Sequence, residues 1–243
     1  MSFSTPVLSL SITILLFSTH IGASQVFQQQ GPVPQVIELY TSEGCSSCPP
    51  ADRYLRTLLD DPQLWKTRIP VAFHVDYWDY IGWKDRFAQE RFSQRQRTLQ
   101  FTGAVSSVYT PGWVVDGKEW RGFFYRQSLP DRSGRSGGLL TLKLDNNLAS
   151  LQYAPTKQHT HPLRAHLVVM TFDQYSQVKA GENRGKILRH AFIAQSLQQA
   201  EGTTRWQFRL DSFNRQQGRH AIAAWVTEGS TATPLQALGG WLK

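Results

Sequence analysis

Residues 36–50 read VIELYTSEGCSSCPP, and this stretch decides how the rest of the chain is interpreted. An apolar run is followed there by Cys45 and Cys48, the only two cysteines in the 243 residues. Two thiols at this spacing, between a predicted strand and a predicted helix, favour a dithiol–disulfide redox pair. Stability is a poor reason for the pair, because a bridge across so short a loop removes little entropy from the unfolded chain. Two alternatives stay open: an inert local disulfide, and a metal site, for which no second cysteine pair supplies further ligands.

The N-terminal segment is a predicted export signal. Residues 7–17 form a short apolar stretch, and small residues follow it up to Ala23 and Ser24. This pattern is typical of a secretory signal peptide, here residues 1–24, cleaved near Ala23 or Ser24. No Lys or Arg precedes the apolar stretch, so an uncleaved anchor remains an alternative. We expect a periplasmic or secreted protein, located where disulfides persist, with no transmembrane span in the mature chain.

Residues 25–130 alternate predicted strands with predicted helices. Short runs of strand-forming residues alternate with segments whose apolar residues recur every three or four positions. The expected elements are strands at 36–40, 69–75 and 112–115 and helices at 51–59 and 86–101, the second with Asp85 as its N-cap. Strand, helix, strand, helix and a final hairpin strand predict an α/β unit around a central sheet.

Residues 139–243 follow a different pattern. Apolar and polar residues alternate in several short segments, and glycine or asparagine turn signals separate the later ones. This pattern predicts a sandwich-like unit of short strands. Residues 131–138, rich in Ser, Gly and Arg, are the expected linker. The predicted fold class is therefore an α/β domain at 25–130 followed by a mostly β, sandwich-like domain at 139–243.

Four motifs carry a family resemblance: ELYTSEGCSSCPPAD at 38–52, HVDYWD at 74–79, VYTP at 108–111 and GEN at 181–183. Together they resemble the secreted thioredoxin-like family catalogued as domain of unknown function 1223, over roughly residues 34–243. The resemblance implies a thioredoxin-like fold for residues 25–130. In that fold Pro111 would be a cis proline facing the disulfide. It implies a fold more directly than it implies an activity.

The same resemblance implies roles for the site residues. Cys45 would be the exposed, more acidic, attacking thiol, and Cys48 the buried thiol that resolves the mixed disulfide. Glu38 resembles a buried carboxylate that takes a proton from Cys48, the alternative being a strand-edge carboxylate bonded to the backbone. Glu43 is expected to be an exposed loop carboxylate. The residues between and after the cysteines depart from the usual pattern, and a helix that starts at Pro49 would weaken the dipole effect on Cys45.

Two further groups of polar residues are candidate sites. His74, Asp76 and Asp79 follow the 69–75 strand, at the sheet edge where the cysteines are expected. They could bind a metal or polarise a substrate, and the alternative is a set of caps in a hydrogen-bonded turn. A looser histidine group is expected to lie in a loop; its members are His159, His161 and His166. We expect neither a metal nor a cofactor.

Charge and motifs together give the functional hypothesis. It is an exported thiol–disulfide oxidoreductase acting on a protein or small thiol/disulfide substrate, with a redox partner protein. The alternative is a non-catalytic envelope binding protein on a thioredoxin-like scaffold, with a structural disulfide. Most of the net charge of +8 lies in residues 131–243, which favours an anionic envelope surface as partner or else a merely soluble, basic surface. No basic run or binding motif is present, so we expect no nucleic-acid partner.

Overall fold

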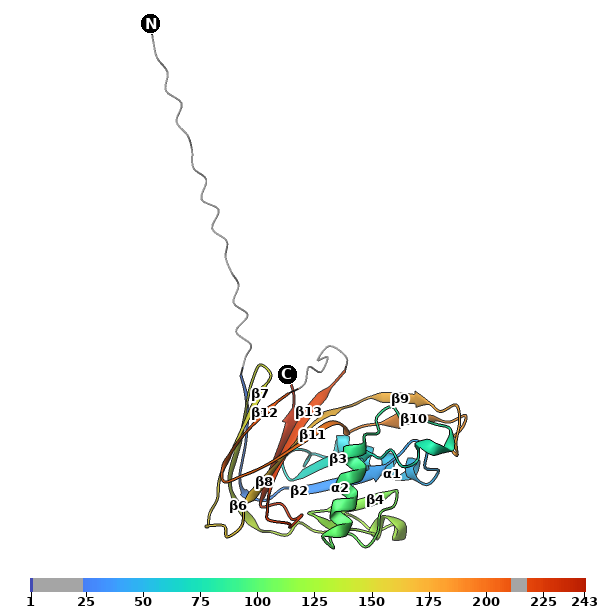
Figure 1. Cartoon of the computed structure of the whole chain (residues 1–243), viewed down its shortest axis with the longest axis horizontal. Coiled ribbons are helices and arrows are strands. Elements are labelled where there is room, and N and C mark those ends of the chain that lie inside the picture. The colour runs from blue at the N-terminus through green and yellow to red at the C-terminus, as the bar shows by residue number, and fades with distance from the viewer. Residues whose placement is uncertain (2–23, 211–217) are drawn as a thin grey trace.

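The computed structural model describes Met1 and residues 24–210 and 218–243, and this part of the chain is mostly β-strand (Figure 1). The expected signal peptide therefore lies almost wholly outside the described residues. Two α-helices are present in the described part, α1 (Cys48–Thr57) and α2 (Glu90–Phe101). No helix in these ranges is long and apolar enough to cross a membrane.

An eight-stranded sheet forms the centre of the molecule, in the order β14-β13-β8-β11-β3-β2-β4-β5. Its strands are β2 (Gln35–Thr41), β3 (Arg68–His74), β4 (Gly112–Val115), β5 (Lys118–Glu119), β8 (Leu163–Thr171), β11 (Ile193–Gly202), β13 (His220–Glu228) and β14 (Gln236–Trp241). Strand β3 pairs in parallel with both β2 and β11, and the other neighbours are antiparallel. The two strands beside β3, β2 and β11, thus come from distant parts of the sequence.

A second, four-stranded sheet covers one end of the first, as in a β-sandwich. It consists of β1 (Gln25–Pro32), β6 (Ser136–Asp145), β7 (Leu148–Ala154) and β12 (Arg205–Arg209). Side chains alternate between the two faces of a strand, and in β8 the residues Ala165 and Leu167 point to the sandwich while Val168 and Met170 point away. The apolar layer between the sheets, here called the sandwich core, includes Leu142, Leu151, Leu167, Trp206, Phe208 and Ile222.

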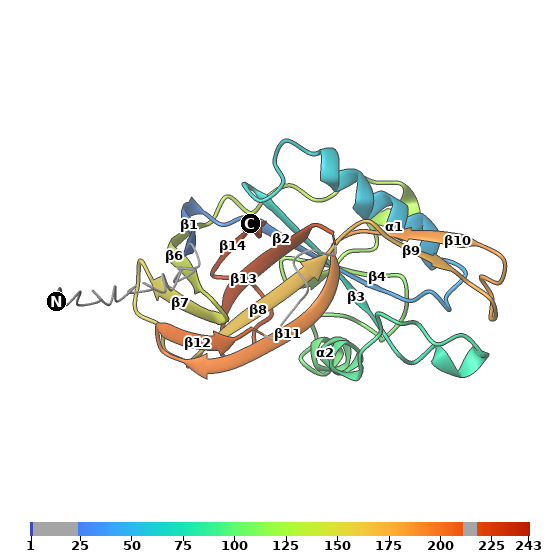
Figure 2. The same cartoon turned by 90° about the horizontal axis from the view of Figure 1, so that it is seen from above.

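The two helices flank the other end of the large sheet, on opposite sides of β2, β3 and β4 (Figure 2). Helix α1 begins at Cys48 with two prolines in its first turn, where their missing N–H groups cost nothing. It buries Ala51 and Leu55 at helical spacing, and a 3-10 turn (Leu58–Asp60) ends it. The larger apolar cluster under both helices draws side chains from both halves of the chain, among them Ile37, Phe73, Phe92, Trp113, Met170, Phe192 and Trp225.

A separate hairpin projects beside α1. Strands β9 (Gln174–Gln177) and β10 (Ile187–His190) pair only with each other and form their own two-stranded sheet. Figure 2 shows the hairpin running alongside α1. Asp173 and Phe192, which flank its two ends, have φ angles of 56° and 57°, values that non-glycine residues adopt rarely. The hairpin is thus joined to the body at two tight bends.

The predicted fold class, an α/β thioredoxin-like domain followed by a mostly β, sandwich-like domain, is wrong. The described residues are mostly β, with two α-helices and several sheets, and no thioredoxin-like α/β pattern is evident. Strands from 25–130 and from 139–243 share the large sheet, where Ile193 pairs with Ala72. Strand β1 likewise pairs with β6, which begins at Ser136, inside the expected linker. Local periodicity placed most strands, but it carries no information on which distant strands pair.

Candidate functional site

Cys45 and Cys48 are joined by a disulfide in the turn that connects β2 to α1. Only 1% of the surface of Cys45 and none of that of Cys48 is exposed, so the prediction of an exposed Cys45 is wrong. Ser46 and Ser47 between them are exposed. The Ser47 hydroxyl oxygen lies 3.3 Å from the Cys45 sulfur. Because α1 begins at Cys48, Cys45 lies before the helix and receives little of its dipole.

The Thr110–Pro111 peptide bond is cis, as predicted. Pro111 is buried and leads directly into β4, the antiparallel neighbour of β2. The Thr110 hydroxyl accepts a hydrogen bond of 2.7 Å from the indole N–H of Trp78. Trp78 also packs against Gly44, where an added Cβ would lie 2.9 Å from the Trp78 Cβ. The loop after β3 is thus fastened to both the cysteine turn and the cis peptide.

Glu38 is engaged in a buried ion pair. Its two oxygens accept hydrogen bonds of 2.7 Å each from the Arg95 guanidinium, and the Tyr40 hydroxyl donates a third at 2.8 Å. Burial, together with the charge of Glu38, holds the pKa of Tyr40 well above its usual value, so Tyr40 stays a donor. Protonating Glu38 would leave the Arg95 charge buried without its partner. Glu38 is therefore engaged in this ion pair and in the Tyr40 hydrogen bond.

Five buried ionisable residues flank the cysteine turn, and we call them the ionisable cluster: Glu43, Asp52, His74, Asp85 and His190. Glu43 is fully buried, so the prediction that it is an exposed loop carboxylate is wrong. It accepts hydrogen bonds from the Trp83 indole at 2.8 Å and from His190 Nε2 at 3.1 Å. Burial opposes ionisation of Glu43, but the hydrogen bond from His190 outweighs it and lowers the pKa.

His74 and Asp85 form the innermost pair of the cluster. His74 Nδ1 lies 2.7 Å from an Asp85 oxygen, and both side chains are fully buried. Burial alone would lower the pKa of His74, but the charge of Asp85 outweighs burial and raises it. Burial alone would raise the pKa of Asp85, but the charge of His74 outweighs burial and lowers it. Asp85 also accepts the backbone N–H groups of Glu43 and Phe87, each at 2.9 Å. It therefore ties the cysteine turn to the loop and does not cap α2, which begins at Glu90.

Asp52 is the member of the cluster closest in sequence to the cysteines. It lies one helical turn after Cys48, on the same buried face of α1. Its carboxylate is 4.0 Å from His190 Nδ1. Burial raises the pKa of Asp52, although His190 and His74 oppose the shift. Within the described ranges, His190 Nδ1 and His74 Nε2 have no hydrogen-bond partner, so this side of the cluster can hold and pass a proton.

Asp76 and Asp79, predicted with His74 as site residues, are turn-forming residues, and only Asp79 contacts the cluster, through the Asp85 backbone. The Ser93 hydroxyl of α2 donates to Asp76, and the Asp85 backbone N–H donates to Asp79 at 3.1 Å. Burial raises the pKa of Asp79. Among residues 24–210 and 218–243, no three His, Cys, Asp or Glu side chains are placed to hold a metal ion. These contacts agree with the alternative reading of the pair as caps in a turn.

The three later histidines do not form one group. His159 and the exposed His161 both lie near Glu228, at 3.0 and 3.9 Å. Hydrogen bonds from the His159 ring and from two backbone N–H groups lower the pKa of Glu228 to about 2. His166 is buried in β8, away from that loop, and stacks on Trp225 with ring centroids 4.9 Å apart. They belong to a loop and to the sheet, and not to the cysteine site.

The GEN turn of the β9–β10 hairpin binds the cysteine turn directly. Asn183 is fully buried, and its amide donates hydrogen bonds of 2.8 Å to the carbonyl oxygens of Glu43 and Cys45. The exposed Glu182 accepts the backbone N–H of Ser46 at 3.0 Å. The sequence marked this motif without giving it a role, because the contact spans 138 residues of chain. In the structure the GEN turn fixes the backbone at Cys45 through these hydrogen bonds, and we call this contact the clamp.

Two solved structures resemble the chain. Protein AGR_C_4864 from Agrobacterium tumefaciens aligns with a TM-score of 0.57 and 22% identity, over 88% of this chain and 96% of its own. HBP35 of Porphyromonas gingivalis aligns with a TM-score of 0.53 and 13% identity, over 87% of this chain and 76% of its own. At these identities the likeness concerns the fold alone. No curated protein matches the chain significantly.

The match to a sequence family covers the candidate site and most of the eight-stranded sheet. Residues 36–227 fit the family described as "Protein of unknown function (DUF1223)". This range contains the disulfide, the ionisable cluster and the GEN turn. It also contains the four motifs on which the resemblance was based. The chain therefore belongs to the DUF1223 family.

Proposed function

We propose that the protein is an exported thiol–disulfide oxidoreductase. Its redox pair is Cys45–Cys48, and the β9–β10 hairpin covers this pair. The observation that carries the proposal is the ionisable cluster beside the disulfide. Burying five ionisable side chains costs stability, and such groups concentrate where proton transfer is needed. A disulfide with a sequence separation of three adds little stability that would justify this arrangement.

The exchange would proceed in two steps. A thiolate of a substrate dithiol attacks the Cys45 sulfur, the Cys45–Cys48 bond breaks, and Cys48 leaves as a thiolate. The second substrate thiolate then attacks the substrate sulfur of the mixed disulfide and releases Cys45. The substrate loses two electrons and two protons, which reappear on the two cysteine thiols. Protonated Asp52 would supply the proton to Cys48, and the reverse sequence reduces a substrate disulfide.

Access to the pair requires movement, because both cysteines are buried. The hairpin is suited to it, since it pairs with no other strand among the described residues and joins the body through the bends at Asp173 and Phe192. It holds the cysteine turn through Asn183, Glu182 and His190. We therefore expect the rate of exchange to depend on how often these contacts open.

The Asn183 contacts offer a direct test. Each of the two hydrogen bonds contributes about 0.5–1.5 kcal/mol, so Asn183→Ala should speed reaction with dithiothreitol by about 5-fold to 150-fold. Stopped-flow tryptophan fluorescence or quenched alkylation would measure the rate. Asn147→Ala, an exposed asparagine in the β6–β7 turn, is the matched control and should react at the wild-type rate. Equal rates for the two variants and wild type would remove the covering role of the hairpin.

The Asp52 assignment is tested by pH dependence. Asp52→Asn should flatten the rise and fall of the exchange rate with pH, and it should raise the unfolding free energy at pH 7 by about 0.5–2 kcal/mol. The gain is expected because an acid whose pKa burial raises destabilises the folded state above its ordinary pKa. An unchanged pH profile contradicts the proton-transfer role.

The redox assignment itself is tested with the cysteines. The wild-type pair should reach equilibrium with glutathione buffers, and Cys45→Ser/Cys48→Ser should stay folded and lose exchange. If the double variant unfolds and the wild type fails to exchange even with small dithiols, the pair is a structural disulfide in a non-catalytic binding protein.

Export is the remaining part of the proposal. Cleavage near Ala23 or Ser24 would leave β1 complete, since it begins at Gln25. Such a mature protein would occupy a compartment where the disulfide persists. Expression of the full chain, cell fractionation and intact-mass measurement would test it: we expect a periplasmic or secreted product that lacks about 23 residues. A full-length product in the cytoplasm contradicts export.

A further inference from the structure

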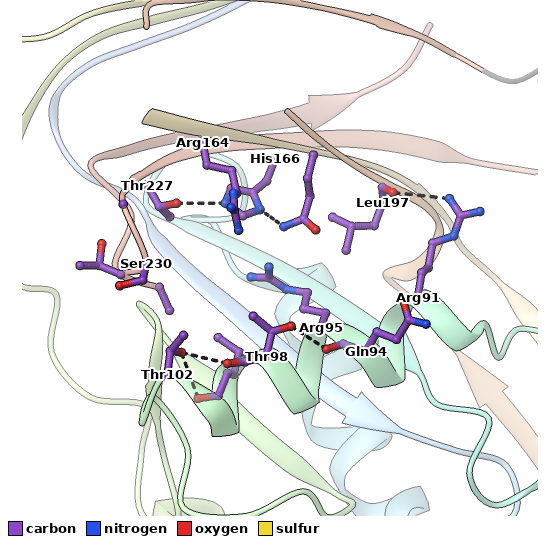
Figure 3. A pocket seen from close by; sticks show the side chains of 15 residues that line it. Arg91, Gln94, Arg95, Thr98, Thr102, Arg164, His166, Leu197, Thr227 and Ser230 are labelled. Carbon is purple, nitrogen blue, oxygen red and sulfur yellow. Dashed lines mark hydrogen bonds between the residues drawn. The ribbon is translucent and has the colours of Figure 1, made fainter. Parts of the chain in front are cut away.

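A polar pocket lies between α2 and the large sheet, on the face opposite the sandwich core (Figure 3). Its volume is about 220 Å³. Pockets for drug-sized ligands usually enclose about 300–1,000 Å³, so this one fits a smaller molecule. Figure 3 shows side chains of α2 on one side of the space and side chains of the strands on the other.

The sheet wall is built by cross-strand neighbours. In β8, Arg164 pairs in register with Glu201 and Thr227, and its guanidinium contacts the exposed Glu201 carboxylate. Two positions along, His166 accepts a hydrogen bond of 2.8 Å from Gln199 at one ring nitrogen and lies 3.1 Å from the Thr227 hydroxyl at the other. The alternation that sends Ala165 and Leu167 to the sandwich core sends these polar residues to the pocket.

The helix wall is one face of α2. Arg91, Arg95, Thr98 and Thr102 recur at spacings of four, three and four, so they lie in a row along the helix. Arg95 is buried and pairs with Glu38, which places it at the bottom of the pocket. Arg91 is exposed at the mouth; within the described ranges its guanidinium forms no ion pair and reaches only the Leu197 carbonyl, at 3.5 Å.

Among the described residues, the pocket carries one uncompensated positive charge, that of Arg91, because Glu38 pairs with Arg95 and Glu201 pairs with Arg164. Three arginines line it and no carboxylate does, and the partners of Arg95 and Arg164 lie outside the lining. Burial, and then the charges of Arg95 and Arg164, hold the pKa of His166 well below its usual value, so the imidazole is a neutral hydrogen-bonding group. An arginine without a carboxylate at the mouth of a polar recess is a typical arrangement for oxyanion recognition.

We propose that this pocket binds a small phosphate-type oxyanion, with Arg91 and Arg164 as its direct ligands and Arg95 as the charge beneath it. The site is independent of the cysteine pair, because its lining shares no residue with the ionisable cluster. The net charge of +8 would favour encounter with such a ligand.

Thermal unfolding in inorganic phosphate tests the site, with sodium chloride replaced so that ionic strength stays constant. The wild-type protein should show a saturable rise in Tm. Arg91→Gln and Arg164→Gln should each weaken phosphate binding by about ten-fold or more, because each removes a charged hydrogen-bond donor. Arg205→Gln, an exposed arginine on β12, is the matched control and should bind as the wild type does. A rise that does not saturate, or that is equal in all four proteins, overturns the proposal.

The source of the phosphate group is distinguished by two ligands, glycerol phosphate and phosphatidylglycerol vesicles. Binding of glycerol phosphate alone, dependent on Arg91, indicates a soluble ligand. Co-sedimentation with vesicles that phosphate displaces and Arg91→Gln weakens indicates a lipid headgroup. The site is contradicted if neither inorganic phosphate nor glycerol phosphate binds, and if vesicle binding is changed neither by phosphate nor by Arg91→Gln.

Discussion

The two ends of the eight-stranded sheet differ in the kinds of side chain that they bury. Under β8, β13 and β14 the sandwich core consists of buried apolar and aromatic side chains. Beside β2 and β3 the chain buries the five residues of the ionisable cluster and, close by, the Glu38–Arg95 pair. Apolar burial stabilises a fold, whereas buried charges cost desolvation that their partners only partly repay. Both ends of the sheet therefore bury apolar side chains, but the β2–β3 end also buries this concentration of ionisable groups.

The largest expected effect comes from Glu38→Gln. It leaves the buried Arg95 charge without its carboxylate, and the unfolding free energy should fall by about 3–5 kcal/mol. Replacing both members, by Glu38→Leu with Arg95→Met, should recover most of the loss. Urea denaturation would measure both. Exchange by the folded fraction should be unchanged; if Glu38→Gln stays stable but stops exchanging, Glu38 is the proton acceptor after all.

A smaller loss is expected from the apolar end. Leu151→Ala removes a side chain that is 1% exposed in the sandwich core, and it should cost about 2–5 kcal/mol. The loss should be the same from pH 5 to pH 9, since no ionisable group is disturbed. The redox potential of Cys45–Cys48 should not change. A shifted potential would show that the two ends of the sheet are coupled.

The smallest effect is a change in how stability depends on pH. The pKa of His74 is raised above 6.5, so its contribution is complete below that pH and is lost as pH rises through the folded-state value. The pKa of Asp85 is lowered from 3.8, so its contribution is lost only in acid. His74→Gln should abolish the alkaline decline, measured as Tm from pH 5 to pH 9. His161→Gln, at an exposed position, should leave the decline intact.

Much of this structure could be predicted locally. Strands predicted at 36–40 and 69–75 and a helix predicted at 51–59 lie close to the observed β2, β3 and α1. The cysteine spacing pointed to a disulfide, and the family resemblance carried in part by the VYTP motif implied the cis proline. These features depend on neighbouring residues, which a sequence displays directly.

The errors concern contacts between distant segments. Glu43 was expected in solvent, but His190 reaches it from 147 residues away. Asp85 was expected to cap a helix, yet it binds the Glu43 backbone across 42 residues. The fold class failed for the same reason, because β11 pairs with β3 across the expected domain boundary. Periodicity shows that a residue faces a core, but not which distant residue it meets there.

The clamp at Asn183 has a consequence for biosynthesis. The two thiols lie three positions apart and can react as soon as both have been synthesised, while the asparagine that secures their turn follows 138 residues after Cys45. Oxidation can therefore precede docking of the hairpin. Once the hairpin has docked, any later change in the oxidation state of the pair requires these contacts to open. Pulse-labelling with a thiol reagent during synthesis would show whether the pair oxidises before the hairpin docks.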